Sequence, residues 1–71
     1  MNYILRTEDD KVVDVFEIKK ELLDFTRKLL NEFNNDMLKN ETPEECITYP
    51  IETVGDCENV LYGFGYRIEL R

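Results

Sequence analysis

The sequence NVLYGFGYRIELR occupies residues 59–71, and apolar residues fall on every second position along it. The apolar set is Val60, Tyr62, Phe64, Tyr66, Ile68 and Leu70. Alternation of this kind is typical of a β-strand with one buried face. Such a face could also be an exposed platform on which bases stack. We predict that it is core, because an amphipathic helix earlier in the chain needs an apolar partner surface. Gly63 and Gly65, on the other face, favour a bulge or the close approach of another backbone.

That helix is predicted to begin near Phe16 and to end near Lys39 or Asn40. Apolar residues recur at helical spacing along one side of it, and charged or amide residues cover the other side. The apolar residues are Phe16, Ile18, Leu22, Leu23, Phe25, Leu29, Leu30, Phe33 and Met37. Asp14, with Glu17 three residues later, has the spacing of a capping box at the start.

Short strands are predicted on both sides of the helix. Before it, residues 3–5 and 12–15 flank the polar turn TEDDK and indicate a hairpin. After it, Thr42, Pro43 and Glu45 predict one short helical turn with a second capping box. The β-branched stretch CITYPIETV, residues 46–54, predicts an edge or kinked strand because Pro50 lacks a ladder donor. The predicted fold is therefore α+β, in the order ββαββ, with one long amphipathic helix on a small antiparallel sheet.

Length and composition predict one small domain spanning residues 1–71. The chain has 71 residues, of which 42% are hydrophobic and 35% charged, so its core is small and dimerisation would stabilise it. The start has no long apolar run of the kind found in signal peptides, and no other stretch suggests a membrane span. We therefore expect a cytoplasmic protein. Its two cysteines, Cys46 and Cys57, are expected to be free thiols.

The residue types that are missing argue against catalysis. The chain contains no His, Ser, Trp, Ala or Gln, which removes the commonest general base and the serine nucleophile. Cys46 and Cys57 lie in an acidic segment, which disfavours a thiolate, so a thiol enzyme is the least favoured function. We expect no enzyme activity, no cofactor and no metal site, since neither acidic stretch has the spacing of a calcium loop.

Charge is distributed unevenly along the chain. The net charge is -7, and residues 40–59 contain six acids and no base. No basic stripe is present to neutralise phosphates, so direct binding of DNA or RNA is not expected. The acids could be solvated turns, or they could face a basic partner. The candidate partner-binding residues are Glu8, Asp9, Asp10, Glu41, Glu44, Glu45, Asp56 and Glu58, together with Glu17, Glu21 and Asp24 on the helix.

By size and composition alone, this short acidic chain resembles the small host-takeover and inhibitor proteins of bacteriophages. Some members of that class mimic DNA: their carboxylates stand in for phosphates and block basic host proteins such as HU-type nucleoid proteins, nucleases or repressors. The resemblance implies an inhibitory binding module in the cytoplasm of a bacterial host. Small immunity or regulatory proteins share this composition. An alternative from another class is a structural or assembly protein that self-associates through its sheet, and a homodimer is compatible with both.

Overall fold

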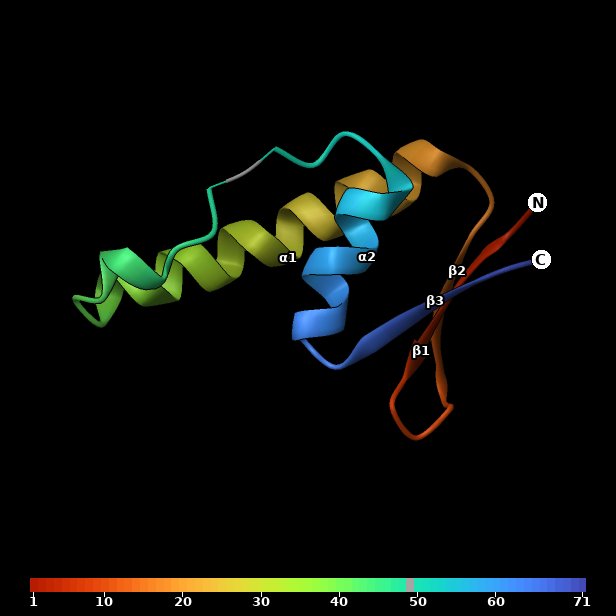
Figure 1. The fold of residues 1–71 in the computed structure, drawn as a ribbon, viewed down its shortest axis with the longest axis horizontal. Helices are drawn as coiled ribbons and strands as arrows, with labels where there is room; N and C mark the ends of the chain where they lie inside the picture. The colour runs from red at the N-terminus through yellow and green to blue at the C-terminus, as the bar shows by residue number, and fades with distance from the viewer. Residues whose placement is uncertain (49) are drawn as a thin grey trace.

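Two layers make up the fold: a three-stranded antiparallel sheet, and two helices on one of its faces (Figure 1). A computed structural model describes residues 1–48 and 50–71. The elements are β1 (Tyr3–Thr7), β2 (Val12–Phe16), α1 (Lys19–Lys39), the 3-10 turn η1 (Pro43–Glu45), α2 (Val54–Gly63) and β3 (Tyr66–Leu70). The strand order is β2-β1-β3. The α+β class, the long helix and the small antiparallel sheet are confirmed.

The predicted hairpin is present, and its strands are longer than expected. Strand β2 continues to Phe16, which pairs with Tyr3 and is buried on the helix side of the sheet. Asp14 therefore lies inside a strand and does not cap the helix. The N-cap residue of α1 is Ile18, whose side chain makes no capping hydrogen bond. The predicted end of the helix is confirmed, with Asn40 as the C-cap.

Helix α1 packs on the rest of the domain through the face that the sequence predicts. Leu22, Thr26 and Leu30 are buried along this face, and the Thr26 hydroxyl donates to the Leu22 carbonyl at 2.9 Å. The first half of α1 lies beside the sheet, whereas the second half projects away from it (Figure 1). This projection contributes to the elongated shape, since the Cα atoms span 40 × 26 × 14 Å along the principal axes.

The main error of the sequence prediction is the single strand with one buried face that it assigned to residues 59–71. Its first part is the end of α2, and only residues 66–70 form a strand. On the helix, Leu61 is fully buried although it was expected to face outward, and Tyr62 is 64% exposed. Gly65 has φ 87° and directly follows the C-cap Phe64, so its left-handed backbone ends the helix.

The strand predicted over residues 46–54 is also wrong for the part of the chain that the structure describes. Residues 46–48 and 50–53 belong to no strand, and Val54 already begins α2. Tyr49 lies outside the described residues. The order of elements is therefore ββααβ, with η1 between the two helices.

The short helical turn predicted after Thr42 is present as η1, but its predicted capping box is wrong. The Thr42 hydroxyl donates to the Met37 carbonyl, near the end of α1, and does not cap η1. A capping box forms instead at the start of α2, between Thr53 and Asp56.

The core lies between the two helices and the central strand. Leu5 of β1, Leu22 of α1 and Leu61 of α2 are each fully buried and meet there. Among the described residues, the buried apolar set is Leu5, Phe16, Leu22, Leu30, Ile51, Cys57, Val60 and Leu61. None of the helices that the structure describes lies over the opposite sheet face (Figure 1), and Val12, Val13 and Val15 of β2 are about half exposed.

Candidate functional site

The predicted acidic residues lie in separate places. Glu8, Asp9 and Asp10 occupy the exposed tip of the β1–β2 hairpin, where Asp10 donates its amide to the Thr7 carbonyl at 3.0 Å. Glu41, Glu44 and Glu45 are exposed beyond the end of α1, on the part of the molecule that projects from the sheet. Figure 1 places the hairpin tip at the bottom of the sheet and residues 41–45 at the far end of α1, so the fold does not join them into one patch.

The projecting end is shaped by a tight reversal of the chain. Glu41 has φ 59°, and the Thr42 amide donates to the Met37 carbonyl at 2.8 Å. Pro43 then begins η1 at a position where its missing N–H is not needed. This local geometry keeps the carboxylates of η1 in solvent. We name Glu41, Glu44 and Glu45 the acidic end.

After the acidic end, the chain returns along α1 toward α2 (Figure 1). We call residues 46–48 and 50–53 the strap. The side-chain amide of Asn34 holds the strap at Ile47: it donates to the Ile47 carbonyl at 2.8 Å and accepts from the Ile47 amide at 2.9 Å. Two helical turns earlier, the Arg27 guanidinium donates to the carbonyl of the buried Ile51. The strap is thus fixed at both of its described parts.

Asp56 is occupied by the helix cap. One of its carboxylate oxygens accepts from the amides of Glu52 at 2.9 Å and Thr53 at 3.0 Å. These backbone hydrogen bonds hold the pKa of Asp56 below its ordinary value. Asp56 therefore stabilises the start of α2, while its role toward a partner stays a prediction.

The helix carboxylates form a mixed surface. Glu17, Glu21 and Asp24 are exposed as predicted, and Asp24 lies 3.7 Å from the Arg27 guanidinium in a loose ion pair. Lys28 follows Asp24 by one turn on the same side of α1. This surface is therefore less negative than the acidic end.

All four arginines are engaged within the domain. Arg27 contacts Asp24 and the strap, as described above. Arg6 and Arg71 share one carboxylate, that of Glu69, at 2.8 and 2.9 Å. Hydrogen bonds from Arg6, and next from Arg71, lower the pKa of Glu69. This cluster lies on the sheet face that no helix covers.

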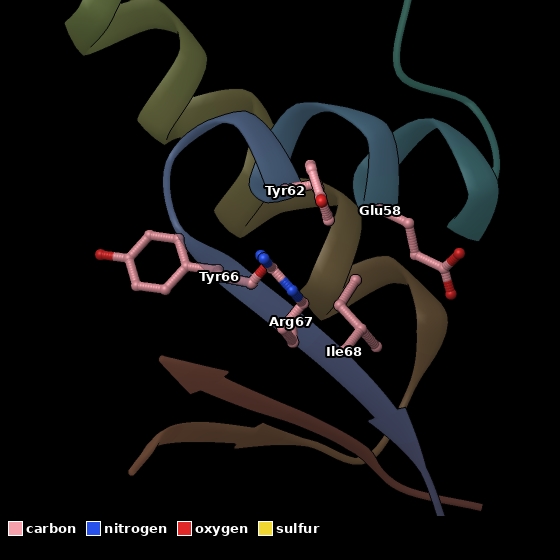
Figure 2. Close-up of a pocket in the computed structure, with 5 residues that line it drawn as sticks. All are labelled: Glu58, Tyr62, Tyr66, Arg67 and Ile68. Carbon is pink, nitrogen blue, oxygen red and sulfur yellow. The ribbon is translucent and has the colours of Figure 1, made fainter. Parts of the chain in front are cut away.

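Arg67 makes three contacts within the domain, and Figure 2 shows its position beside Tyr62. Its guanidinium lies 4.0 Å from the centroid of the Tyr62 ring, donates to the Tyr66 carbonyl at 2.8 Å and lies 3.4 Å from the Glu8 carboxylate. Glu58, Tyr62, Tyr66, Arg67 and Ile68 line a shallow hollow of about 190 Å³ between α2 and β3. The sequence prediction missed the stack because it placed Tyr62 in the core.

Most carboxylates, in contrast, make no ion pair and no side-chain hydrogen bond to any residue that the structure describes, and all of these are exposed. They are Asp9, Asp10, Glu17, Glu21, Glu32, Asp36, Glu41, Glu44, Glu45, Glu52 and Glu58. The arginine charges are thus matched internally, whereas the excess negative charge faces solvent.

The cysteines are free thiols, as predicted. Cys57 is fully buried, and this burial raises the pKa of its thiol, which opposes thiolate formation near neutral pH. Within residues 1–48 and 50–71, no three acidic, cysteine or histidine side chains are grouped as metal ligands. None of the described helices is long and apolar enough to cross a membrane.

Comparisons of this chain with known protein families, with curated protein sequences and with solved structures gave no match. The functional argument therefore depends on the charges and contacts described above.

Proposed function

We propose that this protein is a non-enzymatic binding module that inhibits a basic, DNA-binding protein by occupying its DNA site. In this mechanism, exposed carboxylates pair with the Lys and Arg side chains that would otherwise grip phosphates. An HU-type nucleoid protein is the kind of target that fits, because its DNA-binding surface is basic and reads little sequence. The proposed location is the cytoplasm, of a bacterial host if the gene is carried by a phage.

The observation that carries the proposal is the contrast between the two kinds of charge. Each arginine lies within ion-pair distance of a carboxylate of the same domain, whereas the five lysines make no ion pair with a described residue and are outnumbered by the carboxylates that make none. The carboxylates without such partners lie along a molecule whose Cα atoms span 40 Å. A basic protein that meets this surface gains ion pairs without first breaking internal ones.

The acidic end is the favoured contact surface. Glu41, Glu44 and Glu45 are exposed on a reversal fixed by backbone hydrogen bonds, and Lys39 is the nearest base in the sequence. A preorganised array loses little side-chain and loop entropy on binding. Glu52 continues the negative charge onto the strap, and the hairpin tip offers a second, separate group.

The first experiment is capture from a bacterial lysate on the immobilised protein, with the bound proteins identified by mass spectrometry and eluted by increasing salt. The proposal expects a basic DNA-binding protein that elutes early in the salt gradient and is also displaced by added duplex DNA. A captured protein that resists salt and is unaffected by DNA would contradict DNA mimicry.

A second candidate function is assembly through the sheet. It is favoured by the half-exposed Val12, Val13 and Val15 on a sheet face that no helix covers. An assembly of this kind hardly weakens with salt, which separates it from the charge-led complex. A small immunity or regulatory protein would also bind one partner, but DNA would not compete for that partner.

A further inference from the structure

The outer edge of β3 has backbone groups that no other described strand binds, and the Arg67 guanidinium lies beside them, on the Tyr66 carbonyl and the Tyr62 ring. Asn2 and Arg71 donate their backbone amides to each other's carbonyls, at 2.6 and 2.9 Å. This pair determines which of the following β1–β3 pairs are hydrogen-bonded. Hydrogen-bonded pairs alternate with non-bonded pairs in an antiparallel ladder. Glu69 and Arg67 consequently bond to β1, whereas Tyr66, Ile68 and Leu70 direct their N–H and C=O groups away from it.

The opposite edge of the sheet is blocked. Strand β2 carries an irregularity where its register with β1 shifts, between Leu5 and Arg6, and such bulges hinder edge pairing. The Asp14 carboxylate also accepts the Val15 amide at 2.8 Å. Strand β3 has a regular register throughout, and no described residue accepts a side-chain hydrogen bond from the Ile68 or Leu70 amide. The two edges therefore differ in their readiness to pair.

The sequence of β3 is complementary to itself when two copies run antiparallel. Around a two-fold axis at Ile68, Ile68 faces Ile68 of the second copy and Arg67 faces Glu69 of the second copy. Tyr66 then faces Leu70 of the second copy. Opposite charges and apolar side chains in directly opposed positions are the pairs that stabilise sheets.

The hydrogen-bond phase agrees with the same axis. Ile68 directs both of its backbone groups outward, so the two Ile68 residues exchange both hydrogen bonds. Tyr66 and Leu70 form the next bonded pairs, and the Tyr66 carbonyl can accept the new bond on its second lone pair beside the one from Arg67. Arg67 and Glu69 fall at non-bonded positions, where opposed side chains lie closer.

We infer that the protein forms a two-fold dimer in which β3 pairs antiparallel with β3 of a second copy, giving a continuous six-stranded sheet. In this dimer Arg67 exchanges its contacts with Tyr62 and Glu8 for Glu69 of the second copy, a carboxylate that Arg6 and Arg71 of that copy also contact. Leu70, now 49% exposed, is covered from the side by Tyr66 of the second copy. This inference does not depend on the proposed function, because the acidic end lies away from β3.

Two proline variants at matched positions test the edge. Leu70→Pro removes an outward amide of β3, and Val15→Pro removes an outward amide of β2; neither amide serves the ladder to β1, and both side chains are about half exposed. Sedimentation equilibrium of the wild type should give a dimer with a dissociation constant of roughly 10 to 100 μM. Leu70→Pro should raise the dissociation constant at least about tenfold, because each dimer contains two copies of the lost backbone hydrogen bond. Val15→Pro should leave the dissociation constant unchanged.

Charge exchange tests the register. Arg67→Glu and Glu69→Arg each place like charges opposite one another in their own dimers, whereas a mixture of the two restores opposite charges at both sites. Each variant alone should be monomeric, and the mixture should form heterodimers, with folding checked by circular dichroism. A wild type that remains monomeric at about 1 mM overturns the inference, and so does a dimer that tolerates Leu70→Pro. Weakening by Val15→Pro alone would place the interface at β2 and would also overturn it.

Discussion

Asn34 binds both backbone groups of Ile47, with its amide nitrogen 2.8 Å from the Ile47 carbonyl oxygen and its amide oxygen 2.9 Å from the Ile47 nitrogen. This paired contact replaces the strand partner that Ile47 lacks. It also shows how Ile47, a β-branched residue, is held against α1 without joining the sheet. The chain that carries the acidic end is therefore fixed to α1 at a defined point.

Asn34→Ala should release the strap. The substitution leaves the donor and acceptor of the half-buried Ile47 without a protein partner, so the free energy of unfolding should fall by about 1 to 3 kcal/mol. Urea denaturation measures this loss, and hydrogen exchange should show that the Ile47 amide loses its protection. The neighbouring exposed Asn35→Ala should stay within about 0.5 kcal/mol of the wild type. Unchanged exchange at Ile47 in Asn34→Ala would contradict the described contact.

Leu61 and Tyr62 distinguish helix α2 from a strand over the same residues. Leu61 is fully buried in α2, so Leu61→Ala should cost about 2 to 5 kcal/mol of stability. Tyr62 is 64% exposed, and Tyr62→Ala should cost no more than about 1 kcal/mol, mainly from the lost stacking with Arg67. Thermal or urea unfolding of the two variants gives the comparison. The reverse order of effects is expected only if Tyr62 is in the core.

Asp56 should make stability depend on pH. Its native pKa lies below the ordinary value of 3.8, so the ionised carboxylate contributes stability above that pH, and this contribution is lost as pH falls through the native pKa. Asp56→Asn should therefore be less stable than the wild type near neutral pH, and the difference should shrink below pH 3.8. Urea midpoints measured for both proteins across this range provide the test. A difference that stays constant with pH would show that the charge of Asp56 plays no part in the cap.

The sequence predicts the first half of the fold well because each local signal agrees there with the tertiary contacts. The apolar period of α1 matches its buried face, and the polar turn TEDDK matches the hairpin. Only the boundary between β2 and α1 is predicted wrongly. Phe16 fits both the two-residue period of a strand and the helical period, and its pairing with Tyr3 makes it part of the strand. Tertiary pairing overrides the local cap at Asp14.

The second half fails because its intrinsic preferences oppose its structure. Residues 54–63 contain two glycines, two valines and a tyrosine, all weak helix formers. The helix is stabilised by the Thr53–Asp56 capping box and by burial of Cys57, Val60 and Leu61 at helical spacing. Both signals are present in the sequence. The alternation over residues 60–70 conceals them because Val60 and Phe64 fit both periods.

The candidate site is predictable in composition but not in arrangement. The acids at the hairpin tip and beyond α1 are exposed as expected, whereas Asp56 is used by the helix cap. The pairing of Arg6 and Arg71 with Glu69 requires strands distant in sequence to meet, which no local pattern reveals. Because of this internal pairing, the charged side chains that make no ion pair and no side-chain hydrogen bond with a described residue are eleven carboxylates and five lysines, so negative charge predominates among them.

The central claim, that carboxylates of the acidic end take the place of DNA phosphates, is tested most directly by competition for a basic DNA-binding protein. The measurement is the fluorescence anisotropy of labelled duplex DNA bound to an HU-type nucleoid protein or to the captured target, titrated with wild type, with Glu44→Lys/Glu45→Lys, or with the control Lys19→Glu/Lys20→Glu.

Both glutamates are exposed, and their carboxylates make no ion pair or hydrogen bond with described residues, so folding should survive their reversal. The wild type should displace the DNA, and Glu44→Lys/Glu45→Lys should compete at least about tenfold more weakly, since each new lysine repels the basic surface. The control should compete as well as the wild type or better. If the folded Glu44→Lys/Glu45→Lys variant displaces DNA as effectively as the wild type, the acidic end does not stand in for phosphates.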